Sequence, residues 1–189
     1  MWFKMRAVDL DFLQTAPRTY VVERNVAVPR GAVWDAFSDP TTWRHWWPGV
    51  RSASYGSSPK PYGVGTFREA TVGGQRYEEY IVAWDAGRHF AYYIDRATVP
   101  IAKAQLESTE LVDDGEGTRV RWTIACEPRL LLRAASPFFR GIMERMLARA
   151  MANLEIFVRV EGAIPTARMG SAPARMDATA ATARNESLR

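Results

Sequence analysis

The sequence is poor in the residues that build disulfide frameworks and metal centres. Its 189 residues include one cysteine, Cys126, and two histidines, His45 and His89. A single cysteine excludes an intramolecular disulfide and a cysteine-based zinc site. His45 follows an arginine in a predicted helix and His89 opens a predicted strand, so both are interpreted as surface residues rather than catalytic bases. We therefore expect no metal and no cofactor.

Long apolar runs are also missing. No stretch approaches the ~20 consecutive apolar residues that a membrane-spanning helix needs. The first twelve residues carry charges inside their only apolar stretch and offer no small-residue cleavage site, which argues against a secretory signal. The sequence thus predicts a cytoplasmic protein without stable membrane insertion, and we expect a monomer or a weak homodimer.

Lysine is scarce, and the basic charge is not concentrated anywhere. Of 25 basic residues only three are lysine, and the net charge is +4. The last 28 residues contribute +2 of this charge, so the remainder of the chain is close to neutral. Because no basic block is present to neutralise a run of phosphates, the pattern predicts no nucleic-acid binding.

The composition separates a globular body from its two ends. Hydrophobic residues make up 47% and charged residues 24% of the chain, which is typical of a folded domain. Residues 162–189 have no aromatic residue and few large aliphatic ones, so they are predicted to be a disordered tail. Residues 1–17 form a lead-in whose apolar side chains could dock on the body. The predicted domain spans residues 18–161.

The apolar periodicity of this body predicts strands, two short helices, further strands and a long helix. Turn residues such as Gly73-Gly74 and the acidic hairpin around Gly115 separate the strands. The predicted strands are residues 19–29, 50–56, 63–72, 75–84, 88–95, 102–112 and 118–128, and the predicted helices are residues 29–38, 41–47 and 137–160.

Alternation within the strands indicates an antiparallel sheet with one dry face. In the last strand Val120, Trp122 and Ile124 lie on one face, and Arg119 and Arg121 lie on the other. In the long helix one apolar stripe faces the sheet. It comprises Phe139, Met143, Met146, Leu147, Ala150, Leu154 and Phe157.

Two segments of the body resemble the START-like, or SRPBCC, superfamily in its polyketide cyclase/dehydrase branch. The first is a strand, helix and turn near the N-terminus, and the second is a glycine-threonine-arginine hairpin before the last strand. The matching residues are Val26, Val28, Pro29, Val33, Trp34, Asp35, Phe37, Trp47, Pro48, Val50, Gly117, Thr118 and Arg119.

This resemblance implies an α+β helix-grip fold. In that fold a curved antiparallel sheet of about six or seven strands wraps around a long C-terminal helix, two short helices follow the first strand, and a cavity lies between helix and sheet. The composition agrees, because seven Trp, seven Tyr and eight Phe are hard to pack on a curved sheet without leaving space. Methionines on the helix would add a flexible apolar lining.

The candidate ligand-binding residues are mostly aromatic. Tyr80, Val82 and Trp84 are expected to share a face that points at the long helix, as are Phe90, Tyr92 and Ile94. Trp47 is interpreted mainly as part of the fold signature. The candidates are Trp34, Phe37, Trp43, Trp46, Tyr80, Trp84, Tyr92, Trp122, Met143, Met146 and Leu147.

Evidence for catalysis is weaker. Cyclisation of a polyketide needs a base that removes an activated C–H proton and a donor for the enolate oxygen. Glu78, on the Tyr80 face, and Arg68, on the preceding strand, are the candidates, and the alternative is a salt bridge on the wet face. Glu79 is the choice in the other register, because one bulge would exchange the two glutamates.

Three functions remain open at this point. The first is binding or carriage of a lipid, isoprenoid or polyketide-like molecule in the cavity. The second is a polyketide cyclase or dehydratase that uses general acid/base chemistry, and the third is a protein-interaction module. The arginines on the outward face of the long helix are interpreted as a solvated surface rather than a membrane or partner contact.

Overall fold

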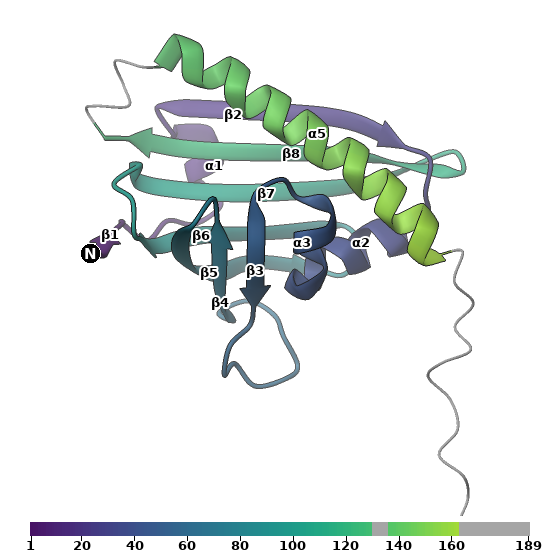
Figure 1. The fold of residues 1–189 in the computed structure, drawn as a ribbon, viewed down its shortest axis with the longest axis horizontal. Coiled ribbons are helices and arrows are strands. Elements are labelled where there is room, and N and C mark those ends of the chain that lie inside the picture. Colours follow the sequence, from purple (N-terminus) through teal and green to yellow (C-terminus); the bar gives the residue numbers. More distant parts are fainter. Residues whose placement is uncertain (130–135, 163–189) are drawn as a thin grey trace, which may run out of the picture.

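The protein is built on one antiparallel sheet that is crossed on one face by a long helix (Figure 1). The computed structural model describes residues 1–129 and 136–162. The strands are β1 (Phe3–Lys4), β2 (Arg18–Val26), β3 (Val50–Ser54), β4 (Phe67–Val72), β5 (Gln75–Asp85), β6 (His89–Ala97), β7 (Ala102–Asp114) and β8 (Gly117–Pro128). Their order is β2-β8-β7-β6-β5-β4-β3, and β1 pairs with β6. The predicted helix-grip architecture is confirmed, with the two-residue β1 as an addition.

Two short helices connect strands that lie at opposite edges of the sheet. α2 (Arg30–Ser38) follows β2, and a 3-10 turn (Pro40–Thr42) leads into α3 (Trp43–Trp46) before β3. Asp39 caps the turn, because its side chain accepts a hydrogen bond of 2.9 Å from the Thr41 amide. Four tryptophans lie in this link, on the face that α5 also covers: Trp34, Trp43, Trp46 and Trp47.

Helix α5 (Ser136–Gly162) packs on that face, which is called the inner face below. It contacts β2, α2 and α3 (Figure 1). Leu147, Ala150 and Leu154 of the predicted apolar stripe are almost completely buried, and so is Met151, which the predicted stripe did not include. Arg145, Arg149 and Arg159 lie on its exposed side.

The N-terminal lead-in covers part of the opposite, outer face. Phe12, in α1 (Phe12–Thr15), packs against Leu106 and Ala125, and Met5 packs against Ala97. Both faces of the central strands are therefore buried in this region. The domain boundary at residue 17 stays a prediction, and residues 163–189 of the predicted tail lie outside the described residues.

Strand β5 departs from simple alternation, which corrects one expectation. Its register against β6 shifts between Ile81 and Ala83, so Val82 is an extra residue on β5. Trp84 faces the inner core, whereas Tyr80 faces outward and stacks on Tyr93 with 5.8 Å between ring centroids. The expectation that Tyr80, Val82 and Trp84 share the helix-facing side is therefore wrong, because it assumed an unbroken strand.

The glycine-threonine pair at the start of β8 closes the end of the sheet. A Cβ on Gly117 would lie 2.6 Å from the Val26 carbonyl oxygen, which is too close for any other residue without a shift of the backbone. The buried Thr118 hydroxyl donates a hydrogen bond of 2.8 Å to the Val28 carbonyl. Gly117 and Thr118 thus join the start of β8 to the end of β2 and the segment that follows it.

We expect Gly117→Ala to destabilise the fold by about 1–3 kcal/mol, because the added methyl group overlaps backbone that is fixed on both sides. Gly31→Ala is the matched control, since a Cβ there meets nothing within 4 Å and alanine favours the helix. Urea unfolding followed by circular dichroism measures both. Equal stability of the two variants would contradict the close-approach argument.

Candidate functional site

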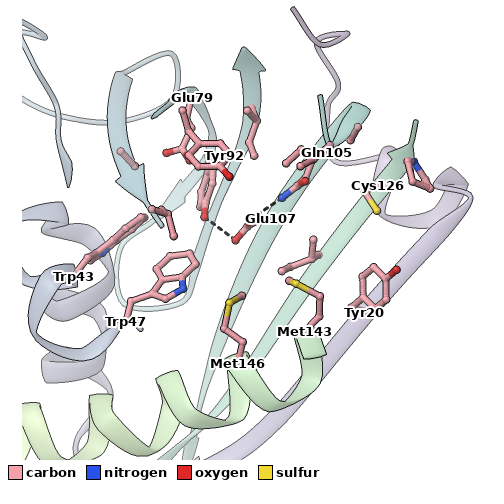
Figure 2. A pocket seen from close by; sticks show the side chains of 18 residues that line it. Tyr20, Trp43, Trp47, Glu79, Tyr92, Gln105, Glu107, Cys126, Met143 and Met146 are labelled. Atoms are coloured by element: carbon pink, nitrogen blue, oxygen red, sulfur yellow. Dashed lines mark hydrogen bonds between the residues drawn. The ribbon is translucent and has the colours of Figure 1, made fainter. Parts of the chain in front are cut away.

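A cavity of about 280 Å³ lies between the inner face of the sheet and α5 (Figure 2). Most of its lining is apolar, and the polar groups come mainly from β5, β6 and β7. The lining residues are Tyr20, Trp43, Trp47, Ala70, Val72, Tyr77, Glu79, Tyr92, Ile94, Ile101, Ala102, Gln105, Glu107, Ile124, Cys126, Pro128, Met143 and Met146. Met143 and Met146 of α5 lie opposite the sheet (Figure 2).

Glu107 on β7 is the most strongly hydrogen-bonded of the polar groups. Its Oε2 accepts hydrogen bonds from the Tyr92 hydroxyl at 2.7 Å and from the Trp122 indole N–H at 3.2 Å. Its Oε1 accepts one from the Gln105 amide at 3.0 Å (Figure 2). Burial raises the pKa of Glu107 to about 7, although the bond from Tyr92 opposes this rise. The carboxyl group therefore exchanges its proton near neutral pH.

A second carboxylate, Glu79 on β5, is paired with a buried arginine. The Arg68 Nε donates a hydrogen bond of 2.6 Å to Glu79 Oε2, and both side chains are buried. The guanidinium lies 4.0 Å from the Trp43 ring centroid and 3.9 Å from that of Tyr92, so it is held between two aromatic rings. Burial raises the pKa of Glu79, and the Arg68 charge opposes that rise.

Some buried donors near the cavity have no partner. The indole nitrogen of Trp47, which lines the cavity, makes no hydrogen bond to the described residues, and neither do the two terminal nitrogens of Arg68. Buried N–H groups normally find an acceptor. The indole N–H of Trp47 is thus a buried donor without an acceptor among the described residues.

Comparison with known protein families shows to which family the chain belongs. A family model described as "Polyketide cyclase / dehydrase and lipid transport" matches residues 17–155. The chain belongs to this family. The START-like resemblance found in the sequence is confirmed.

Solved structures of similar fold share little sequence with this family member. A START superfamily protein from Mycobacterium smegmatis is 13% identical with a TM-score of 0.64, over 76% of this chain and 98% of that one. The Zhui aromatase/cyclase from Streptomyces sp. R1128 is 17% identical with a TM-score of 0.63, over 77% of this chain and 95% of that one. At these identities the likeness shows the fold. A search of curated proteins finds no match.

Four of the predicted ligand-binding residues line the cavity of this polyketide cyclase family member: Trp43, Tyr92, Met143 and Met146. Six others are packed in the core beside it rather than on its wall, namely Trp34, Phe37, Trp46, Trp84, Trp122 and Leu147. Trp122 nevertheless reaches Glu107 through its indole N–H. Tyr80 lies on the outer face, away from the cavity.

The two predicted catalytic residues are separated by the sheet. Arg68 is on the inner side, behind Trp43 and Tyr92, and it does not line the cavity. Glu78 lies on the outer side and pairs with Arg96. Glu79 is the glutamate that faces the cavity, as the alternative register predicted. The physical reason is again the bulge at Val82, which reverses the faces of the preceding residues relative to Trp84.

Glu107 and Gln105 did not emerge from the sequence. In residues 102–112 alternation separates Gln105 and Glu107 from Ala104 and Leu106, and the more apolar set would be expected to face the core. The structure has the reverse, because α1 and the rest of the lead-in bury Leu106 on the outer face. The alternation was visible in the sequence, but the lead-in determined which of the two sets of residues faces the cavity.

Residues 1–129 and 136–162 contain neither a metal-ligating cluster nor a membrane-spanning helix. No group of three or more His, Cys, Asp or Glu side chains there could hold a metal ion. No helix within those ranges is long and apolar enough to cross a membrane.

Glu107 should make the stability of the protein depend on pH. Its folded pKa of about 7 lies above its ordinary value of 4.5, so the proton is bound more tightly in the folded state. The resulting stabilisation is complete below pH 4.5 and is lost as the pH rises through 7, with a magnitude on the order of 3 kcal/mol. Glu107→Gln should remove this component and be more stable than wild type at pH 8. Urea unfolding at several pH values between 4.5 and 8 measures it.

Glu78→Gln is the control for this experiment. It alters an ion pair on the outer face, so it should change the free energy of unfolding by no more than about 1 kcal/mol and keep the wild-type pH dependence. A Glu107→Gln variant with an unchanged pH dependence would show that Glu107 titrates at its ordinary pH in the folded protein.

Proposed function

We propose that the protein binds a hydrophobic small molecule in the cavity under α5. The observation that carries this proposal is the mostly apolar cavity of about 280 Å³. An engineered apolar cavity of about 150 Å³ is enough to bind benzene, so this volume has room for two fused rings or a short branched chain. The flexible side chains of Met143 and Met146 suit a ligand of irregular shape.

The family supports the same proposal in general terms. Its description joins polyketide cyclisation or dehydration with lipid transport, and both activities require an apolar ligand to be enclosed. Binding or carriage of a lipid, isoprenoid or polyketide-like molecule needs only the cavity. Four expectations stay predictions from the sequence. They are the lack of nucleic-acid binding, the monomeric or weakly dimeric state, the cytoplasmic location and the alternative role as a protein-interaction module.

Native mass spectrometry of gently purified protein tests the binding directly. We expect the additional mass of one small molecule on the wild-type chain, because pockets of this kind bury most of the surface of a bound ligand. Met143→Arg should lose it, since the new charge enters the cavity wall. Ile142→Arg is the matched control, because Ile142 is the neighbouring residue of α5 and is 54% exposed.

Cys126 provides a second readout that does not depend on a substitution in α5. It is the only cysteine of the chain and it lines the cavity. Burial raises the pKa of its thiol to about 11, so its alkylation at pH 8 should be slow and slower still when the cavity is filled. A bare polypeptide mass together with Cys126 alkylation that no added lipid or aromatic compound slows would refute the proposed binding.

A second function, cyclisation or dehydration by general acid/base chemistry, is favoured by Glu107. A carboxyl group that exchanges its proton near pH 7 inside an apolar cavity is a suitable base for an activated C–H bond. The base would take the proton, the electron pair of the C–H bond would form the C=C bond of an enolate, and the π pair of the carbonyl group would move to its oxygen. Tyr77, which also lines the cavity, offers a hydroxyl group as a donor for such an oxyanion.

Proton exchange at carbon tests this second function without knowledge of the substrate. With 2-tetralone as the probe, we expect the protein to accelerate hydrogen–deuterium exchange next to the carbonyl, with a rate that rises as the pH passes 7. Glu107→Gln should abolish the acceleration and still bind the probe, whereas Glu78→Gln should keep both. Proton NMR in D₂O follows the exchange. Acceleration that persists in Glu107→Gln would exclude Glu107 as the base.

A further inference from the structure

Among the described residues, the charged part of the cavity lining consists of carboxyl groups alone. Two carboxyl groups, Glu79 and Glu107, contribute to the wall. None of the described residues that line the cavity is lysine, arginine or histidine. A ligand that enters therefore meets negative charge and finds no cation on the wall.

A buried cation beside the cavity wall is already paired with one of these carboxyl groups. Arg68 lies behind the rings of Trp43 and Tyr92, and its Nε donates to Glu79 Oε2. Its charge compensates that of Glu79, and this leaves Glu107 without a cationic partner in the described part of the chain. Whenever Glu107 is ionised, the cluster of Arg68, Glu79 and Glu107 carries a net negative charge.

Two neutral donors of the wall are engaged by Glu107. The Tyr92 hydroxyl and the Gln105 amide both donate to it (Figure 2). The hydroxyl group of Tyr77 also belongs to the wall. The wall thus offers carboxylate oxygens that can accept and neutral hydroxyl groups that can donate.

These observations define the polar group that fits. An anion would be buried beside carboxylates without a counter-charge, which is strongly unfavourable. A hydroxyl group is uncharged, donates one hydrogen bond to a carboxylate and can accept another from a neutral donor such as the Tyr77 hydroxyl. We infer that the cavity selects apolar molecules that carry a hydroxyl group, phenols or alcohols, and rejects carboxylates such as fatty acids. This inference rests on the proposed binding of a hydrophobic molecule in the same cavity.

A matched set of two-ring probes tests the selectivity: 2-naphthol, 2-naphthoate and 2-methylnaphthalene. They share their apolar body and differ only in the group to be recognised. Isothermal titration calorimetry at pH 7.5 compares their affinities for the full-length protein. We expect 2-naphthol to bind about tenfold more tightly than 2-methylnaphthalene, because its hydroxyl group donates a hydrogen bond to a charged carboxylate. 2-Naphthoate should bind at least tenfold more weakly than 2-naphthol.

Glu107→Gln identifies the origin of the selectivity. It removes the uncompensated charge, so the ratio between the 2-naphthol and 2-naphthoate affinities should fall severalfold towards one. Glu78→Gln, on the outer face, should keep the wild-type ratio. A wild-type ratio that persists in Glu107→Gln would overturn the role of this carboxylate in the selection.

The outcomes separate this inference from the proposed function. If 2-methylnaphthalene binds and slows the alkylation of Cys126, but 2-naphthoate binds as tightly as 2-naphthol, the selectivity is refuted and the binding cavity stands. If none of the three probes binds and native mass spectrometry shows a bare polypeptide, both are refuted.

Discussion

Arg68 carries a positive charge that is completely buried, and the fold around the cavity depends on how that charge is compensated. It extends from β4, pairs with Glu79 of β5 at 2.6 Å, and is held between Tyr92 of β6 and Trp43 of α3. Three strands and one short helix are thereby fixed to one guanidinium. A buried ion pair of this kind contributes little net stability, but the loss of either partner leaves a bare charge and costs several kcal/mol. The pair therefore specifies where α3 lies on the sheet, and α3 forms one wall of the cavity.

The buried carboxyl group of Glu107, unlike that of Glu79, is not compensated by Arg68. It receives three hydrogen bonds but pairs with no cation among the described residues, so burial dominates and holds its pKa near 7. Such a group lowers the stability of the fold at neutral pH, and proteins accept this cost mostly at functional sites. The contrast with Glu79 is instructive, because both carboxylates face the same cavity. Arg68 compensates one, and the other remains available to a ligand.

The order of the elements and the identity of the fold followed from local patterns, whereas the site did not. Turn residues, alternation and the segments that begin at Val26 and at Gly117 are local, and they predicted the strands, the long helix and the helix-grip arrangement correctly. The face on which a strand residue lies depends on partners that are distant in sequence. One extra residue, Val82, turned Tyr80 and Glu78 outward. The lead-in that buries Leu106 on the outer face turned the apolar side of β7 away from the cavity and left Glu107 facing it.

The aromatic residues show why composition predicted a cavity but not its position. Trp34 meets Trp84 at 5.5 Å and Phe37 meets Trp122 at 5.6 Å, both edge to face, so these rings fill the space between helix and sheet. The volume opens where small side chains such as Ala70 and Ala102 replace rings on the inner face. A curved sheet with a helix across it leaves space wherever its side chains are too short to reach that helix. The position of the cavity therefore depends less on the tryptophans than on the alanines of the strands. The bulges determine which of these alanines face the helix.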